Sequence, residues 1–450
     1  MAEIGNEVWR FSAGDVVFSA PTLDGAGNIY FGALNGRVYS IDDEGNERWS
    51  VQTGDWVESS AALSPDESTI YIGSWDNSLY AIDAATGVVE WTFVTGSFIF
   101  SSPAVAQDVR IFFGGADGFV YALSPNGFAL WEVYIEGEVD ASLAIGPNGD
   151  LYAATSEGSV VCLDDESGDE LWAFQVPVEP GAEARDVIIT SSCLIDGEGS
   201  LFVGCNNYFL YAIDTTDGSL RWNYETAGEI EASPTLGIEG NVLVSSRDGY
   251  LYSISRTGEL DWRTDIGSNI YTSAVVDEIG RIYVSSFIEA ALSYLNLLSP
   301  DGTILQRVPF TGIIDSSVAI APEGRIYLGN NDGNLYAFSN EGRLSNSVWP
   351  KFRGNLASSG SIEGYAVPSP NKERIYNIAL RGSPGGGERD IIAGFSVGGS
   401  DYKTLLGRAA GPGLEGLGVA DYLQDPIISF SELGNSTPFG FHDDWVAGAS

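Results

Sequence analysis

The sequence predicts an all-β fold: an eight-bladed β-propeller closed by an N-terminal strand, followed by a small C-terminal β module. Two observations predict it. A tryptophan returns in a fixed context at intervals of 40 to 50 residues, and eight strand-like segments occupy the same place in successive units. A period of about 40–45 residues is the length of one four-stranded propeller blade. We therefore expect a propeller over residues 1–345, a linker over 346–372 and a partial β-rich module over 373–450.

The repeated tryptophans mark the outer strand D of seven units, and they are Trp9, Trp49, Trp91, Trp131, Trp172, Trp222 and Trp262. Gln306 holds the equivalent place in the following unit. An aromatic side chain at one place in every blade is expected to pack between blades rather than to stack on a ligand. Because Trp9 precedes any inner strand, residues 7–12 are expected to form the outer strand of blade eight and so to close the ring.

Each unit divides into four short strands, A to D. In the second unit they are residues 59–63, 69–73, 78–83 and 88–93. The eight C strands are expected at 38–42, 79–83, 120–124, 160–164, 210–214, 251–255, 293–299 and 335–339. Asn-Gly and Asp-Gly pairs between strands B and C predict type I′ hairpins, since these pairs adopt the positive φ that such turns need.

Composition excludes several classes of function. The chain has 62 acidic and 21 basic residues, a formal charge of −41, and residues 1–345 carry −38 of it without a single lysine. Such acidity disfavours nucleic acid or an anionic membrane as partner. One histidine, His442, is too few for a multi-histidine metal site and makes histidine-dependent nucleophilic catalysis unexpected. The cysteines Cys162, Cys193 and Cys205 fit neither a disulfide framework nor a zinc motif.

One position repeats with chemical alternation just before each A strand. It lies two residues before a small residue, and blades one to eight place there Phe18, Glu58, Phe100, Asp140, Thr190, Glu231, Tyr271 and Asp315. The even blades supply carboxylates, and the odd blades supply three aromatic rings and a threonine. Equivalent positions of a closed propeller surround its axis, so we expect a ring of these side chains at one mouth of the central channel.

This ring is the candidate binding site, and it has a structural alternative. Converging carboxylates raise one another's pKa unless a cation neutralises them. A calcium ion or a basic side chain of a partner would do so, and the aromatic rings suit an apolar or cationic group. Alternatively, strand starts often carry polar residues, and the fourfold alternation records duplication of a blade pair.

Two further tryptophans fall outside the repeat. Trp56 and Trp75 belong to loops of blade two, where they are either anchors for a partner or partly buried. The segment 330–334 resembles a calcium loop superficially but lacks its terminal glutamate, which indicates a hairpin turn.

The phrases Ala81-Ile82-Asp83 to Trp91 and Ala212-Ile213-Asp214 to Trp222 share the pattern A-x-D-x-x-T-G-x-x-x-W. This pattern resembles the repeat of the PQQ-like, quinoprotein-type β-propellers. The superfamily includes PQQ-dependent dehydrogenases and non-catalytic, BamB-like scaffolds of outer-membrane protein assembly. The dehydrogenases carry a vicinal cysteine pair and large inserted loops, which this chain lacks apart from residues 175–187. The segment Trp349-Pro350-Lys351-Phe352 is similar to a W-P-x-F segment found beside such repeats.

The C-terminal part is similar to a β-rich module of secreted bacterial proteins, on the phrases Arg408-Ala409-Ala410-Gly411-Pro412, Leu423-Gln424-Asp425-Pro426 and Asp443-Asp444-Trp445. The resemblance implies an extracellular or periplasmic location. No signal peptide and no apolar run of membrane-spanning length occur in the sequence, so we expect a fragment of an exported protein.

The sequence therefore favours a non-catalytic binding or scaffolding propeller that mediates protein or cell-surface interactions as a monomer. We expect a partner that is basic or bridged by a cation, with calcium as the candidate ion. No catalytic residue and no metal ligand is assigned. The alternative function is a PQQ- and calcium-dependent alcohol or sugar dehydrogenase with its quinone at the channel mouth.

Overall fold

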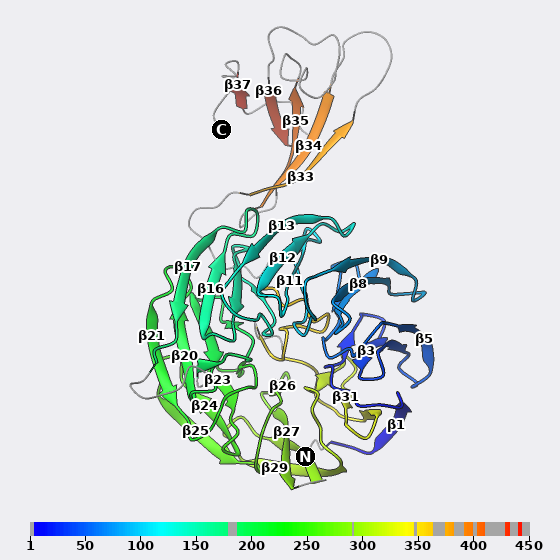
Figure 1. Ribbon diagram of the computed structural model, residues 1–450, viewed down its shortest axis with the longest axis vertical. Helices are drawn as coiled ribbons and strands as arrows, with labels where there is room; N and C mark the ends of the chain where they lie inside the picture. The colour runs from blue at the N-terminus through cyan, green and yellow to red at the C-terminus, as the bar shows by residue number, and fades with distance from the viewer. Residues whose placement is uncertain are drawn as a thin grey trace. The chain divides into compact units, whose positions relative to one another are not determined.

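Eight four-stranded antiparallel sheets succeed one another around a central axis in the computed structural model of the chain (Figure 1). The structure describes residues 4–178, 187–289, 292–345 and 349–362, together with the backbone of five strands between 374 and 442. The chain divides into two compact units, Met1–Val367 and Pro368–Ser450. The first unit is the eight-bladed propeller that the repeat predicts.

Within each blade the strands follow one another outward from the axis. Blades one to four are β2(Thr22–Leu23), β3(Ile29–Ala33), β4(Arg37–Ile41), β5(Glu47–Gln52); β6(Ala62–Leu63), β7(Thr69–Gly73), β8(Ser78–Asp83), β9(Val89–Val94); β10(Ala104–Val105), β11(Ile111–Gly114), β12(Phe119–Leu123), β13(Ala129–Tyr134); and β14(Ala144–Ile145), β15(Leu151–Ala154), β16(Ser159–Leu163), β17(Glu170–Gln175).

Blades five to seven repeat this order, and blade eight takes its outer strand from the N-terminus. They are β18(Leu194–Ile195), β19(Ser200–Gly204), β20(Phe209–Asp214), β21(Leu220–Glu225); β22(Thr235–Leu236), β23(Val242–Ser245), β24(Tyr250–Ile254), β25(Leu260–Asp265); β26(Val275–Val276), β27(Ile282–Glu289), β28(Leu292–Leu298), β29(Ile304–Thr311); and β30(Ala319–Ile320), β31(Ile326–Gly329), β32(Asn334–Phe338), β1(Glu7–Ser12). The pairing of β1 with β32 confirms the predicted closure by residues 7–12.

Two local expectations need correction. The A strands have two residues instead of the five expected in blade two, because the residues before them hydrogen-bond between blades rather than along the sheet. The B–C turns are not type I′. In the first blade Gly36 has φ 73° and its N–H donates to the Ala33 carbonyl, while Asn35 keeps a negative φ. This is a three-residue loop between the paired residues Ala33 and Arg37, with one left-handed residue at its end, a hairpin geometry next in frequency to the two-residue turns.

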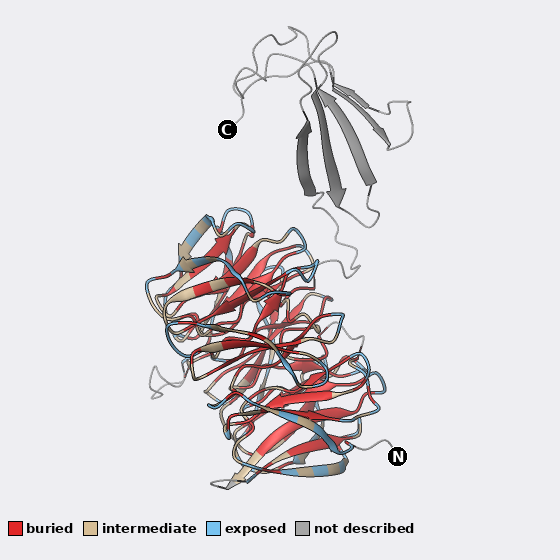
Figure 2. Cartoon of the chain, turned by 90° about the vertical axis from the view of Figure 1, so that its right-hand side faces the viewer, coloured by how far each residue is buried: buried red, intermediate tan, exposed pale blue. Residues whose placement is uncertain are grey.

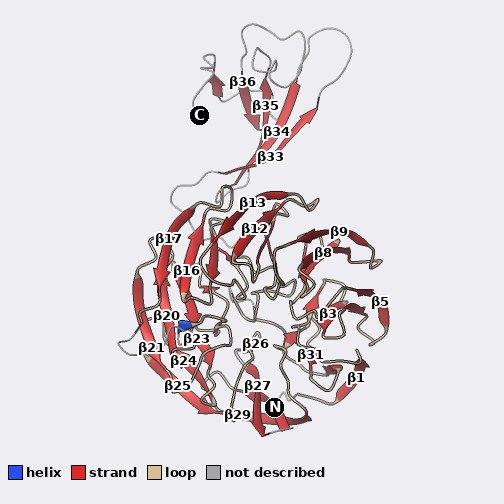
Figure 3. Cartoon of the chain, in the orientation of Figure 1, coloured by secondary structure: helices blue, strands red, loops and turns tan. Residues whose placement is uncertain are grey.

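Burial falls from the axis outward, as Figure 2 shows. Strands A and B are buried on both faces, whereas strand D alternates between exposed and half-buried residues. Figure 3 shows that strands carry the fold, and among the described residues one short helical turn occurs, at Val187. The described residues contain no helix that is long and apolar enough to cross a membrane.

The repeated tryptophans join each blade to the next one. Every indole N–H donates to a backbone carbonyl in the C–D turn of the following blade, at distances between 2.8 and 3.1 Å. The ring lies against the glycine of that turn, as Trp131 does against Gly168, where an added Cβ would stand 2.8 Å from the ring. The seven tryptophans therefore pack between blades.

The seam of the ring uses a different contact. Gln306 replaces the tryptophan there, and its side-chain amide exchanges two hydrogen bonds with the backbone of Ile4, at 2.8 and 2.9 Å. The N–H of Gly5 donates to the Ser339 carbonyl at 2.7 Å. The N-terminal segment thus occupies the place of the missing C–D turn of blade eight.

Residues 349–362 differ from the expected linker of 346–372, and we name them the plug segment. They lie across the centre of the ring (Figure 1), and their carbonyls accept hydrogen bonds from A strands of six blades, through the N–H groups of Leu23, Leu63, Val105, Ile145, Leu236 and Val276. Trp349, Lys351 and Arg353 are buried. The correction has a physical reason, because the innermost strands leave backbone N–H groups without a neighbouring strand, and the plug segment accepts their hydrogen bonds.

The second unit contains a five-stranded antiparallel sheet of β33(Arg374–Arg381), β34(Ile391–Gly398), β35(Lys403–Ala409), β36(Ile428–Glu432) and β37(Gly440–His442). A β-rich C-terminal part agrees with the expectation, although the proposed family of this module stays a prediction. The side chain of His442 and the phrases at 410–427 and 443–445 lie outside the described residues, as do most of the insertion at 175–187 and the rest of the expected linker at 346–348 and 363–372.

Candidate functional site

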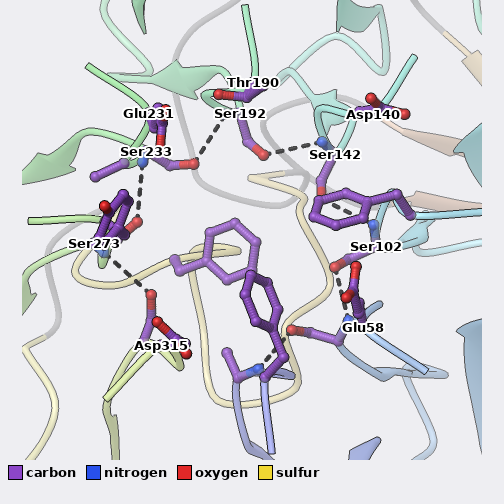
Figure 4. A pocket seen from close by; sticks show the side chains of 18 residues that line it. Glu58, Ser102, Asp140, Ser142, Thr190, Ser192, Glu231, Ser233, Ser273 and Asp315 are labelled. Atoms are coloured by element: carbon purple, nitrogen blue, oxygen red, sulfur yellow. Dashed lines mark hydrogen bonds between the residues drawn. The ribbon is translucent and has the colours of Figure 1, made fainter. Parts of the chain in front are cut away.

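The candidate site lies at the start of the A strands, where each blade turns inward from its outer strand. Each blade has a small residue just before its A strand, and one of the eight predicted ring residues lies two residues before that small residue. Together the eight line one cavity of about 510 Å³, which we call the cup. Figure 4 shows Glu58, Asp140, Thr190, Glu231 and Asp315 around it. The structure thus brings together all eight side chains that the repeat placed in one ring.

A belt of serines holds this ring in place. The backbone N–H of each belt residue donates to the hydroxyl of the serine in the next blade, and seven such bonds of 2.9–3.2 Å run through Ala20, Ser60, Ser102, Ser142, Ser192, Ser233, Ser273 and Ser317. The dashed lines of Figure 4 follow part of this belt. Ala20 offers no hydroxyl, so the belt is open between blades eight and one.

The far side of the cup is formed by the plug segment. Its Phe352 lines the cavity together with the ring and the belt. Next to it, Arg353 donates through Nη1 to the Leu143 carbonyl at 2.6 Å and through Nη2 to the Pro103 carbonyl, which fixes the segment to blades three and four. The central channel is therefore not an open tunnel.

Aromatic side chains gather on the side of blades one to three. The rings of Phe18 and Phe100 meet edge to face, with centroids 6.2 Å apart, although they belong to blades separated by blade two. Trp75 stacks on Phe98 at 4.6 Å and contacts Trp56 at 5.1 Å. Trp56 is 43% exposed, and Trp75 is half-buried. Partial burial therefore holds for Trp75, and a role of the exposed Trp56 as an anchor for a partner stays a prediction.

A basic side chain occupies the side of blades six and seven. Arg247 pairs with Glu229 and lies 3.1 Å from Glu231. Its guanidinium also stands over the ring of Tyr271, 5.0 Å from the centroid, and donates to the hydroxyl at 3.2 Å. The chain itself therefore neutralises one of the four ring carboxylates.

All four ring carboxylates have a raised pKa. Burial raises the pKa of Glu58 to about 7, with a contribution from the negative charge of Asp140. Burial raises the pKa of Asp140 to about 6, helped by Glu138, and it raises the pKa of Asp315. Burial also raises the pKa of Glu231, against the opposing effect of Arg247. Desolvation, rather than the mutual repulsion we expected, is the leading cause.

Arg247 and Phe352 make the sides of the cup differ from one another, and neither was predicted from the sequence as a site residue. Arg247 follows strand B of blade six; at this place blades one to five have Leu34, Trp75, Ala116, Ser156 and Asn206, and blade eight has Asn331. A charged residue at a repeat position that is uncharged in those blades was visible in the sequence and could have indicated a difference in the site. The resemblance to a W-P-x-F segment associated Phe352 with the propeller, but a segment that does not repeat gives no position around the axis and so did not place Phe352 in the cup. The small residues of the belt were recognised, but the hydrogen bonds between blades were not.

Buried cysteines and one acidic cluster lie away from the cup. Cys162, Cys193 and Cys205 are buried and not joined in disulfides, and burial raises the pKa of Cys193 and Cys205 to about 12. Asp165 pairs with Arg110 at 2.6 Å and lies beside Asp164. Neither group extends the candidate site.

Comparison with known proteins agrees with this architecture. The profile of the family described as outer membrane protein assembly factor BamB matches residues 2–125 and 116–342. A curated BamB of Burkholderia pseudomallei is 23% identical over 200 residues, which are 42% of this chain and 51% of that protein. The beta-alanine-activating enzyme of Drosophila melanogaster is 23% identical over 296 residues, 63% of this chain and 26% of that protein. The chain thus spans about half, or less, of the length of these relatives.

A solved structure is similar to the propeller over its whole length. The crystal structure of BamB from Moraxella catarrhalis has a TM-score of 0.63 at 18% sequence identity, covering 75% of this chain and all of that one. At this identity the likeness shows the fold alone.

Proposed function

The chain belongs to the family of the outer membrane protein assembly factor BamB, and from this premise we propose that it is a non-catalytic propeller that binds another protein at the cup. The partner is basic, the propeller acts as a monomer, and its place of action is extracellular or periplasmic. The cup is the observation that carries the proposal. It combines aromatic surface with carboxylates inside a cavity that the plug segment closes on one side.

Charge supports a basic partner. The propeller region carries −38 of the formal charge, and Glu58, Asp140 and Asp315 line the cup without a basic partner among the described residues. Complementary charge accelerates encounter and excludes acidic competitors. A cation placed among these groups would also relieve the unfavourable burial that raises their pKa values.

The alternative, a PQQ-dependent dehydrogenase, does not fit the residues of the cup. The quinone is a flat tricarboxylate and needs cationic or donor groups around it. The cup offers hydroxyl donors but also four carboxylates, which repel a tricarboxylate, and Arg247, the basic residue that contacts its lining, is engaged by Glu229 and Glu231. Reconstitution with PQQ and calcium checks this directly. Quinone absorbance on the protein and dye reduction with alcohols or sugars would contradict the non-catalytic proposal.

A capture experiment tests the proposed function. The full chain serves as bait in a native envelope extract, beside a variant carrying Glu58→Gln, Asp140→Asn and Asp315→Asn. A matched control carries the same loss of charge on the exposed outer surface, as Glu166→Gln, Glu170→Gln and Glu259→Gln. We expect a basic protein that the wild type and the control retain and the cup variant loses. A partner retained equally by all three would contradict binding at the cup.

A further inference from the structure

The four carboxylates of the cup have different surroundings, although the sequence pattern treats them alike. Glu231 is matched by Arg247 from its own blade. Glu58, Asp140 and Asp315 have no such partner within the described ranges, and one carboxylate oxygen of Asp140 is buried without a hydrogen bond. The apparent fourfold ring is therefore an asymmetric cup, in which one carboxylate is matched by a basic side chain and three are not.

Glu58 stands among aromatic rings. Phe18 and Phe100 come from the two neighbouring blades, line the same cavity as Glu58 and meet each other edge to face. Trp75 lies beside the Glu58 carboxyl and is backed by Phe98, which stacks on it at 4.6 Å. Burial raises the pKa of the Glu58 carboxyl, and the buried indole N–H of Trp75 opposes that rise. One carboxylate thus lies inside an aromatic wall, with further carboxylates beyond it.

From this arrangement we propose that the Glu58 side of the cup is a binding site for an ammonium group, presented by a lysine or methylated lysine side chain of the partner protein. The proposal rests on the function proposed above and names the chemistry of its ligand. Aromatic faces attract ammonium groups through their quadrupole, and aromatic cages of this kind recognise methylated lysine. The Glu58 carboxylate supplies the opposite charge at the same place.

The geometry favours a side chain over a free small cation. The cup is about 510 Å³ in volume and extends inward to Phe352, so a group must enter along the axis to reach the belt. A lysine can place its methylene stem along Phe18 and Phe100 while its charged end meets Glu58. On the opposite side of the cup Arg247 already holds Glu231, so Glu58 belongs to the carboxylates that, among the described residues, are left for an incoming cation.

Three peptides test this site on the full chain. They are acetylated Gly-Ser-Lys-Ser-Gly amides, labelled with a fluorophore, that carry lysine, trimethyl-lysine or the neutral Nε-acetyl-lysine. We expect the two cationic peptides to bind at least tenfold more tightly than the neutral one. Glu58→Gln is expected to weaken the cationic peptides at least tenfold, and Phe100→Ala is expected to weaken trimethyl-lysine most. The exposed Glu170→Gln is the matched control and is expected to bind as the wild type does.

The outcomes are distinct. Equal binding of the neutral peptide, or equal affinities for Glu58→Gln and Glu170→Gln, would overturn the proposal, and the peptide comparison on the wild type needs no variant to fold. Choline that binds at least tenfold more tightly than the peptides would assign the site to a free quaternary amine. Calcium that displaces the peptides at low millimolar concentration and loses binding in Glu58→Gln would assign it to a metal.

The same peptides separate this proposal from the proposed function. A partner captured at the cup that excess lysine peptide does not displace would uphold protein binding and refute the ammonium site. Tight peptide binding with no cup-dependent partner in the extract would uphold the ammonium site and refute the partner protein. Displacement of a captured partner by the cationic peptides, and not by the neutral one, supports both.

Discussion

At the Glu58 carboxyl, burial opposes the negative charge that cation binding requires. Its pKa is raised from 4.5 to about 7, mainly by desolvation, with Asp140 adding repulsion. The folded protein therefore holds a proton at this group between pH 4.5 and 7, where the unfolded chain has lost it. Stability contributed by this group is present below pH 4.5 and is lost as the pH rises through 7.

The Glu58→Gln variant tests how much the ionised, buried Glu58 carboxylate destabilises the folded protein. It is expected to gain about 1–2 kcal/mol in the free energy of unfolding at pH 8, after allowance for the partial exposure of the group, and to match the wild type at pH 4. Urea unfolding at both pH values measures the difference. Glu170→Gln, with an exposed side chain, is expected to follow the wild type throughout. A loss of stability at pH 8 would show that the carboxylate is satisfied in the free protein.

Lys351 presents the opposite case in the plug segment. It is buried, donates to the Asn355 carbonyl and the Ser358 hydroxyl at 3.1 and 2.9 Å, and burial lowers its pKa from 10.5 to about 7. Above pH 7 the unfolded chain therefore binds a proton that the folded protein does not. The contribution of this group to stability rises with pH in that range.

We expect wild-type stability to increase between pH 7 and 8.5, and Lys351→Met to flatten that increase. Urea unfolding at intervals of half a pH unit measures the slope. The range ends at pH 8.5 because the buried cysteines, whose pKa is raised to about 12, reverse the trend at higher pH. An unchanged slope in the methionine variant would assign the pH dependence to another group.

At the scale of the element, the outer strand D has the same irregularity and contacts the following blade in the same way in successive blades. Each C–D pair contains a register shift beside the tryptophan position, as between Ala122 and Leu123 opposite Trp131. A bulge bends the strand and increases its twist. The bulge and the indole together direct each outer strand toward the C–D turn of the following blade. The repeated tryptophan therefore makes the same contact between successive blades.

Two glycines allow this contact to be measured. Gly168 and Gly14 both have positive φ, of 75° and 86°, but an added Cβ at Gly168 would meet Trp131 and Val133 at about 2.8 Å, whereas Gly14 has open space. We expect Gly14→Ala to cost about 1 kcal/mol from backbone strain, and Gly168→Ala about 2–4 kcal/mol. Thermal and urea unfolding compare them. Equal losses would mean that the indole can move away freely.

At the scale of the whole molecule, two segments outside the repeat complete the propeller. The N-terminal strand β1 pairs with β32 across the seam, and the plug segment bonds to the A strands of six blades. A ring with an unpaired edge would offer β32 to a second chain. Closure is therefore a property of the molecule as a whole.

Removing residues 1–12 tests closure. The truncated chain loses the pairing of β1 with β32 and the Gln306–Ile4 hydrogen bonds, which leaves β32 as an exposed edge. We expect a lower unfolding temperature and concentration-dependent association, measured by calorimetry and size-exclusion chromatography with light scattering. Removal of residues 1–3 alone, which precede these contacts, is the control. A stable monomer lacking residues 1–12 would show that the seam needs no outer strand.

The sequence by itself determined the fold class, the eight blades, the closing strand and the ring of eight side chains around the cup. It could do so because these features repeat: a period of about 40 residues places equivalent positions at equivalent places around one axis. The same regularity explains why Trp131 and its counterparts were correctly expected between blades.

Only the tertiary structure decided how the cup is differentiated. The position of Phe352, the pairing of Arg247 with Glu231 and the aromatic wall around Glu58 depend on contacts between blades and with the plug segment. These contacts occur once in the molecule, so no repeat announces them, and the plug segment was mistaken for a linker because its hydrogen bonds satisfy distant backbone groups. Periodicity defines a ring of equivalent positions, whereas burial and pairing of charge at each position decide what that ring can bind.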